Sequence, residues 1–144
     1  MFSNRSNSII NLKPELKICN VITTADLKQL VDITRFNKFQ WGLYDLEYYG
    51  GRVGYIKDVT MKGRVTIFQS GKMISTGANS IKQSIEQLKD SMTLMNRNEL
   101  IESISLNPIV RNVVATLNIG KKLNLEVLDG NLSRSRYVPT QFPG

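Results

Sequence analysis

The stretch Phe68-Gln69-Ser70-Gly71-Lys72-Met73-Ile74-Ser75-Thr76-Gly77-Ala78-Asn79-Ser80 decides the fold. Alternating apolar and polar side chains predict one strand that ends at Phe68 and another that begins at Lys72. Ser70-Gly71 supplies the turn between them, because glycine tolerates the positive φ that a tight hairpin requires. Ser80 with Gln83 fits a capping box, so we expect a helix directly after the hairpin.

This helix should continue to about Met95. Its apolar residues fall at positions i, i+4, i+7, i+11 and i+14, which form one stripe on a helix and should face the sheet. The stripe consists of Ile81, Ile85, Leu88, Met92 and Met95.

Upstream, residues 16–24 alternate as a strand. The alternation places Asn20, Ile22 and Thr24 on one face of that strand and Cys19 on the other. Cys19 is the single cysteine of the chain, and its apolar neighbours predict a small buried side chain rather than a reactive thiol.

Other segments are predicted from shorter signals. Asp26 should cap a short helix over residues 27–36. Gly50-Gly51 indicates a sharp turn or bulge, after which residues 52–58 should form a strand. Residues 99–106 are expected to be a connector with some helical character.

The chain then repeats itself at a constant offset of 92 residues, so that Asn112 corresponds to Asn20 and Thr116 to Thr24. Duplication implies that each unit buries a face against its neighbour. By comparison with the first copy, the second lacks about 45 residues, which in the first copy cover three strands and the long helix. We therefore expect a fragment or a reduced natural form, whose exposed strand edges favour pairing with a second copy.

The repeat suggests a division of the chain into four parts. A flexible polar tail should cover residues 1–14, the first repeat 15–96, a connector 97–106 and a partial second repeat 107–144. With 41% apolar residues among 144, the chain can bury one sizeable core.

Composition excludes several classes of function. The net charge of +7 suits a polyanionic partner, although ribosomal and other soluble proteins share such a surplus. Without histidine, and with 12 scattered carboxylates, nothing resembles a metal site or a catalytic dyad. We expect an intracellular protein that is not an enzyme and has no cofactor, membrane span or signal peptide.

The motif F-x-S-G-K-x-x-x-T-G-A-x-S, read in full from Phe68 to Ser80, resembles the signature of the TATA-box-binding protein family. The strand around Asn20 is similar to the opening strand of that family. The resemblance, over about residues 15–144, implies an α+β saddle built from a curved antiparallel sheet, with helices on the convex face and DNA under the concave face. It implies two pseudo-symmetric repeats, the second truncated. This family is itself a known example of minor-groove binding and DNA kinking.

The minor groove offers mainly hydrogen-bond acceptors at A·T pairs, whereas G·C adds an amino donor. A reader of T-A-rich DNA should therefore present a smooth, largely uncharged face with few donors. In the resemblance, paired asparagines donate to bases at the centre of the site and small apolar and hydroxyl side chains line the groove floor. The predicted DNA-binding residues are Asn20, Ile22, Thr24, Tyr49, Thr66, Phe68, Ser70, Lys72, Ile74, Thr76, Asn112, Val114, Thr116 and Phe142.

Some of these residues have special roles in the resemblance. Phe68 and Phe142 match wedges that insert between base pairs, and Tyr49 is the nearest match to a further wedge, without the usual proline after it. Ser70 and Lys72 match phosphate contacts beside the kink.

Three further positions depart from the family pattern. Asn79 stands where a lysine is usual, which removes one phosphate contact. Val138 and Thr140 replace residues that are commonly acidic and help to recruit the B-type transcription initiation factor. The replacements at Val138 and Thr140 weaken the expectation of that partner more than the expectation of DNA binding.

The expected function is that of a general transcription factor. It would bind double-stranded A·T-rich promoter DNA at a TATA box, bend it and nucleate transcription initiation, in the nucleus if eukaryotic or in the cytoplasm if archaeal. An alternative is a protein-interaction module that keeps the fold but has lost or weakened DNA binding. A third reading, a saddle-type half-domain of a nucleic-acid enzyme, is disfavoured because this sequence carries no appended catalytic segment.

Overall fold

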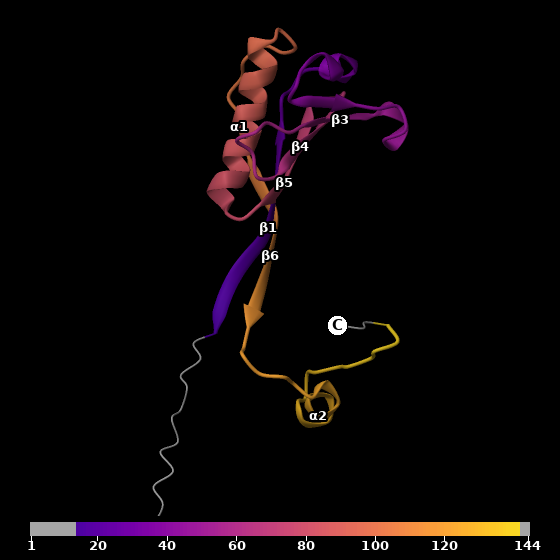
Figure 1. The fold of residues 1–144 in the computed structure, drawn as a ribbon, viewed down its shortest axis with the longest axis vertical. Coiled ribbons are helices and arrows are strands. Elements are labelled where there is room, and N and C mark those ends of the chain that lie inside the picture. Colours follow the sequence, from indigo (N-terminus) through magenta and orange to yellow (C-terminus); the bar gives the residue numbers. More distant parts are fainter. Residues whose placement is uncertain (1–13, 142–144) are drawn as a thin grey trace, which may run out of the picture. The chain divides into compact units, whose positions relative to one another are not determined.

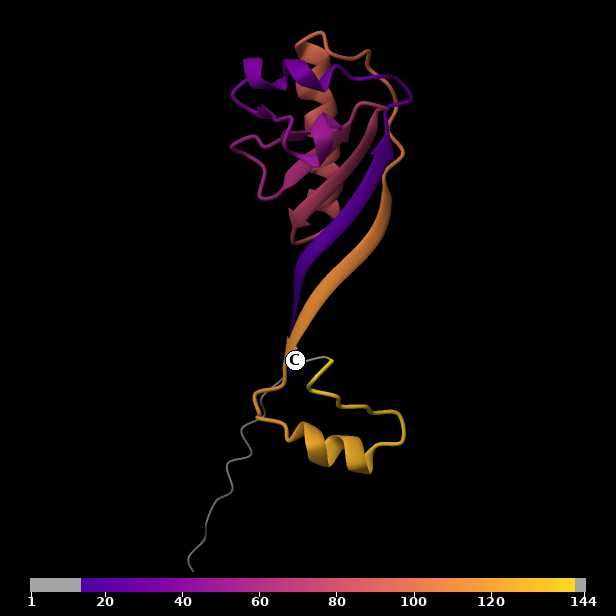
Figure 2. The same ribbon diagram turned by 90° about the vertical axis from the view of Figure 1, so that its right-hand side faces the viewer.

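The computed structural model describes residues 14–141 and divides them between two compact units. The larger unit, Leu16–Thr116, carries a sheet in the strand order β2-β3-β4-β5-β1-β6. Figure 1 shows the strands and helices, and Figure 2 shows that the long curved strands β1 and β6 run in opposite directions. The elements are β1 (Glu15–Asp26), the 3-10 helix η1 (Ile33–Lys38), β2 (Gly42–Tyr44), the 3-10 turn η2 (Tyr49–Gly51), β3 (Val53–Ile56), β4 (Arg64–Phe68), β5 (Lys72–Ala78), α1 (Ile81–Arg97), β6 (Ile109–Asn118) and α2 (Leu125–Asn131). The expectation of an α+β fold with a curved antiparallel sheet is confirmed.

The central hairpin forms as predicted. The Gly71 N–H donates to the Phe68 carbonyl at 2.9 Å, and Gly71 has a φ of 90°. Near the far end of β5, Gly77 has a φ of 83° and marks a bulge, where the pairing of β1 with β5 slips by one residue. The bulge returns Ala78 to the buried face, where Ser75 and Met73 also lie.

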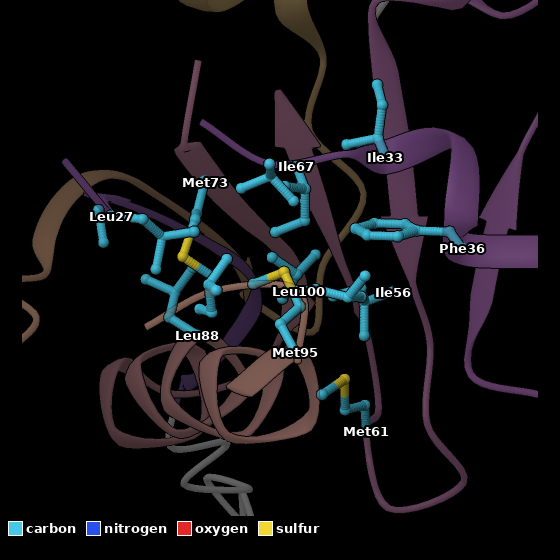
Figure 3. Packing of buried hydrophobic residues seen from close by; sticks show 14 residues of the cluster. Leu27, Ile33, Phe36, Ile56, Met61, Ile67, Met73, Leu88, Met95 and Leu100 are labelled. Carbon is cyan, nitrogen blue, oxygen red and sulfur yellow. The ribbon is translucent and has the colours of Figure 1, made fainter. Parts of the chain in front are cut away.

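The hydrophobic core lies between the sheet and α1 and extends under η1 (Figure 3). Leu88 and Met95 of α1 pack in one cluster with Ile67 and Met73 of the hairpin, and all four are completely buried. Phe36 of η1 joins the same cluster and is also completely buried. The helix begins as predicted, because the Ser80 side chain accepts the Gln83 N–H at 3.1 Å.

The apolar stripe predicted for α1 is wrong in its first half. Ile81 is 46% exposed and Ile85 is half-buried, although both were expected to face the sheet. The residues that face the sheet include polar ones; the buried residues of α1 are Ser84, Gln87, Leu88, Ser91 and Met95.

A buried hydroxyl on β5 explains these polar residues. Ser84 Oγ bonds to Ser75 Oγ at 3.1 Å, and Gln87 Nε2 donates to Ser75 Oγ at 2.7 Å. Gln87 Oε1 accepts the backbone N–H of Gly63 at 2.8 Å. Because a buried polar group without a hydrogen-bond partner is costly, Ser75 requires polar residues opposite it. Thr23, beside Ser75 on β1, keeps a buried Oγ1 with no partner among residues 14–141.

The helix predicted over residues 27–36 is wrong. Leu27 and Val31 donate their N–H groups to the carbonyls of Gly71 and Gln69 in the hairpin loop, at 2.9 and 3.0 Å. This backbone is therefore bonded to the hairpin rather than to itself, and only the 3-10 helix η1 follows. Asp26 accepts the N–H of Lys28 at 2.8 Å in a local turn instead of capping a helix.

Three further predictions need correction. Residues 99–106 contain no helix, because the Gln29 side-chain amide holds this segment by bonding to both the N–H and the carbonyl of Glu102, at 2.8 and 2.9 Å. Cys19 is exposed rather than buried, since β5 pairs with β1 only from Val21 onward. The short strand β2 was not predicted.

The smaller unit contains the described residues 14–15 and 117–141. Its helix α2 begins with a cap, in which the Asn124 side chain accepts the Val127 N–H at 3.1 Å. Leu123 and Leu125 are 52% and 40% exposed, whereas Val31 and Ile33, their counterparts in the first repeat, are 1% and 2% exposed. Across residues 14–141 no helix has the length and apolar character needed to cross a membrane.

Replacing Gln87 with methionine should lower the free energy of unfolding by about 1–3 kcal/mol, because the Gly63 N–H loses its side-chain acceptor and the Ser75 hydroxyl loses one of its two bonds while the side-chain volume is kept. Denaturant unfolding followed by circular dichroism measures this. Lys89→Met, on the exposed side of α1, is the control and should change stability little. Equal stability of both variants would show that the polar contacts between α1 and β5 contribute nothing.

Candidate nucleic-acid interface

One face of the sheet carries α1, and we call the opposite face the open face (Figure 1). Its side chains alternate with buried ones along β1, β4 and β5, and most of them are half-buried or exposed. The open face consists of Asn20, Ile22 and Thr24 on β1, Arg64, Thr66 and Phe68 on β4, and Lys72, Ile74 and Thr76 on β5.

The strand register brings predicted DNA contacts into one row. Thr24 lies opposite Ile74, and Ile74 lies opposite Thr66. The row continues to Tyr55 on β3. Its central members present methyl groups and hydroxyls and no formal charge, as a minor-groove surface requires.

Phe68 lies at the end of β4 on the open face, opposite Val53 and away from α1. It lines a hollow of about 580 Å³ together with Thr24, Lys72 and Ile74, so four predicted site residues meet there. Arg111 lines the same hollow.

Asn20 is held by the bulge in β5. Its Oδ1 accepts the N–H of Gly77 at 2.7 Å. An asparagine amide has one acceptor oxygen and two N–H donors, so this bond leaves the donors of Nδ2 for a ligand. Within residues 14–141, Nδ2 of Asn20 forms no hydrogen bond.

The two predicted phosphate contacts, Ser70 and Lys72, are exposed at the hairpin turn. Lys72 lies opposite Asp26, whose pKa is held below its usual range by the Lys28 N–H that donates to it and then by nearby lysine charges. This carboxylate is therefore ionised at neutral pH.

Tyr49 projects from the turn before β3 and is 74% exposed. Tyr49, Gly50 and Gly51 have φ values of 51°, 64° and 71°, so three successive residues adopt the left-handed conformation. A Cβ at Gly51 would lie 2.7 Å from the Tyr44 hydroxyl, so a larger residue there would have to displace that side chain and adopt a strained positive φ.

The DNA contacts predicted in the second repeat, Asn112, Val114 and Thr116, do not join the open face. Thr116 Oγ1 lies 3.4 Å from Cys19 Sγ, and Arg111 Nε donates to Thr24 Oγ1 at 2.9 Å. Since Cys19 faces away from Asn20, alternation puts Thr116, Val114 and Asn112 on the face opposite the Asn20 side chain. Phe142 lies outside the described residues.

Exposure explains why β6 can adopt this register. All of its ten residues are exposed, so neither face of the strand is buried. A one-residue slip exchanges the two faces of a strand, and burial of one face is what normally prevents it. The repeat pattern predicts that Asn112 and Thr116 share a face with Asn20 and Thr24, whereas the pairing of β6 with β1 places them on the opposite face.

Sequence reasoning missed two basic residues, Arg64 on the open face and Arg111, which contacts it through Thr24. Arg64 lies over the Tyr55 ring, with the guanidinium carbon 4.4 Å from the ring centroid. The period-two alternation before Thr66 already placed Arg64 on this face. Arg111 could not have been found, because its position depends on the register of β6.

Residues 14–141 contain no group of three His, Cys, Asp or Glu side chains placed to hold a metal ion.

Comparisons with known proteins identify relatives. A family model described as "Transcription factor TFIID (or TATA-binding protein, TBP)" matches residues 15–97. A TATA-box-binding protein of Cenarchaeum symbiosum is 39% identical over 128 residues, which cover 89% of this chain and 70% of the relative. A TATA-box-binding protein of Methanosphaera stadtmanae is 32% identical, with coverage of 90% and 70%.

A solved structure shares the fold. The Methanococcus jannaschii TBP matches with a TM-score of 0.73 and 24% identity, over 90% of this chain and 74% of that one. This likeness supports the saddle fold expected from the sequence.

The register of β6 predicts a specific cross-link. Thr116→Cys should form a disulfide with Cys19 under mild oxidation, because the two side chains meet in the structure. Ala115→Cys, one residue earlier and on the other face, is the matched control and should stay reduced. Thiol titration and peptide mass mapping distinguish them, and a disulfide in the Ala115 variant alone would show that β6 pairs in the other register.

Proposed function

The chain belongs to the TATA-box-binding protein family, and we propose that its open face binds the minor groove of A·T-rich promoter DNA, bends it and nucleates transcription initiation. The observation that carries this proposal is the uncharged row of Thr24, Ile74 and Thr66 beside the anchored amide of Asn20. The family consists of DNA-binding transcription factors rather than enzymes.

The row suits A·T pairs for a chemical reason. The floor of the minor groove at A·T pairs offers acceptors and no amino group, so methyl groups can approach it closely. At G·C pairs the guanine amino group would lie against Ile74 and the threonine methyls, where too few hydrogen-bond acceptors are available to it. The Nδ2 donors of Asn20 would bond to base acceptors, and the Gly77 N–H keeps the amide oxygen turned away from them.

The wedge and phosphate roles follow from position. Phe68 lies on the open face at the end of a strand, where an apolar ring can enter between base pairs and kink the duplex. Ser70 and Lys72 are exposed two and four residues further on, within reach of the backbone beside such a kink. Tyr49, on its exposed turn, is proposed as a further wedge.

The second repeat would contact DNA only after β6 changed its register along β1. Asn112, Val114 and Thr116 are proposed DNA contacts, and β6 would have to shift by one residue along β1 to turn them toward the open face. Phe142 is proposed as the wedge of that repeat.

A second copy of the chain is a further proposed partner besides DNA. We take the chain to consist of a first repeat over 15–96, a connector over 97–106 and a partial second repeat over 107–144. Because the second repeat is partial, apolar residues such as Leu123 and Leu125 would be available to a second copy of the chain. Val138 and Thr140 disfavour the B-type initiation factor. The relatives are archaeal, which supports a cytoplasmic, DNA-associated protein.

Fluorescence anisotropy with a T-A-rich duplex and a G·C-substituted duplex, over a salt series, tests the proposal. Binding should favour the T-A-rich duplex, and log K should fall linearly with log[salt] as counterions are released. Equal weak binding to both duplexes, or none, would instead support the alternative of a protein-interaction module.

Phe68→Ala should abolish bending and weaken binding to the T-A-rich duplex roughly 10- to 100-fold, as expected when one aromatic contact with a base is lost. Its thermal unfolding should remain close to that of the wild type, because Phe68 is only half-buried. Bending is measured by fluorescence resonance energy transfer across the duplex. Global unfolding of this variant would assign Phe68 to the core and remove the wedge.

A further inference from the structure

An arginine and two tyrosines form a cluster at the margin of the open face. The guanidinium carbon of Arg64 lies 4.4 Å from the centroid of the Tyr55 ring. Tyr48 meets Tyr55 edge to face, with ring centroids 5.9 Å apart. Tyr55 is only 9% exposed, so the two neighbours cover its ring, while Arg64 itself is exposed.

The cluster continues the row of proposed groove contacts. Tyr55 lies opposite Thr66, and Arg64 lies opposite Thr76. Arg64 also precedes Thr66 by two residues on β4, so both point to the open face. The cluster therefore occupies the β3–β4 side of the face, beyond the uncharged centre.

No carboxylate in the described part of the chain pairs with Arg64. Within residues 14–141 the ion pairs are Lys28 with Asp26 and Lys82 with Glu86. The aromatic ring below Arg64 holds the guanidinium by a cation–π contact, which keeps its N–H groups available. An arginine that would otherwise sample many rotamers is thus held against the sheet.

The ligand that suits Arg64 is an anion of planar or tetrahedral shape, such as a carboxylate or a phosphate. A guanidinium has five N–H donors and no acceptor, and it can bond two phosphate oxygens at once. The uncharged centre of the face suits the groove floor, whereas a positive charge at its margin suits the phosphates that border the groove.

We propose that Arg64, positioned by the ring of Tyr55, binds a backbone phosphate of the DNA that lies on the open face. This inference rests on the proposed function, because it takes the same face to be the DNA-binding surface. Arg64 contributes affinity and salt dependence, and the preference for A·T over G·C comes from the centre of the row. Tyr55 acts through Arg64 and does not itself contact DNA.

The first experiment measures the salt dependence of DNA binding for the full chain and Arg64→Ala. Loss of one phosphate contact should lower the magnitude of the slope of log K against log[salt] by about 0.9, with the preference for the T-A-rich duplex unchanged. Arg97→Ala is the matched control, because Arg97 is exposed at the end of α1, on the covered side of the sheet, and its slope should equal that of the wild type.

The second experiment tests the positioning role of Tyr55. Tyr55→Phe keeps the ring and should keep the wild-type slope of log K against log[salt]. Tyr55→Leu should reduce the magnitude of this slope toward that of Arg64→Ala. The double variant Arg64→Ala/Tyr55→Leu should show no further decrease. Circular dichroism melting confirms that each variant is folded at the assay temperature.

The outcomes separate this inference from the proposed function. If the wild type binds the T-A-rich duplex but Arg64→Ala has the same slope, Arg64 binds no phosphate and the inference is wrong. If Arg64→Ala keeps the slope but loses the preference for T-A-rich DNA, Arg64 reads bases, which also overturns it. If the wild type binds neither duplex, the proposed function itself fails.

Discussion

The hairpin turn at Ser70-Gly71 is the constraint on which the first repeat depends. Its carbonyl groups accept the backbone N–H groups of Leu27 and Val31, so the chain that follows β1 is bound to the turn between β4 and β5. A Cβ at Gly71 would lie 2.2 Å from the Gln29 carbonyl oxygen, which leaves room only for glycine. This close approach brings Leu27 and Val31 into the core and aligns β1 beside β5.

The alignment gives β5 two faces with different chemistry. Toward α1, Ser75 is completely buried and its hydroxyl is bonded by Ser84 and Gln87. Away from α1, Ile74 and Thr76 belong to the open face. The bulge at Gly77 serves both faces, because it returns Ala78 to the core and presents its own N–H to Asn20.

The two repeats show how much burial depends on neighbours. Residues of the same type at equivalent positions are covered in the first repeat and exposed in the second, as Val31 and Leu123 show with exposures of 1% and 52%. The strand β6 is affected in the same way. With neither face covered, its register is set by contacts such as that of Arg111 with Thr24 rather than by the burial of an apolar face.

The sequence by itself determined the local elements and the family. The alternation around Phe68, the glycine at the turn and the Ser80 cap predict the hairpin and the start of α1, because each depends on residues close together in the chain. Tertiary structure decided what depends on distant partners. The segment after Asp26 is extended because the hairpin binds it, α1 turns polar residues inward because Ser75 lies opposite, and Arg64 is held in place because Tyr55 lies on the neighbouring strand.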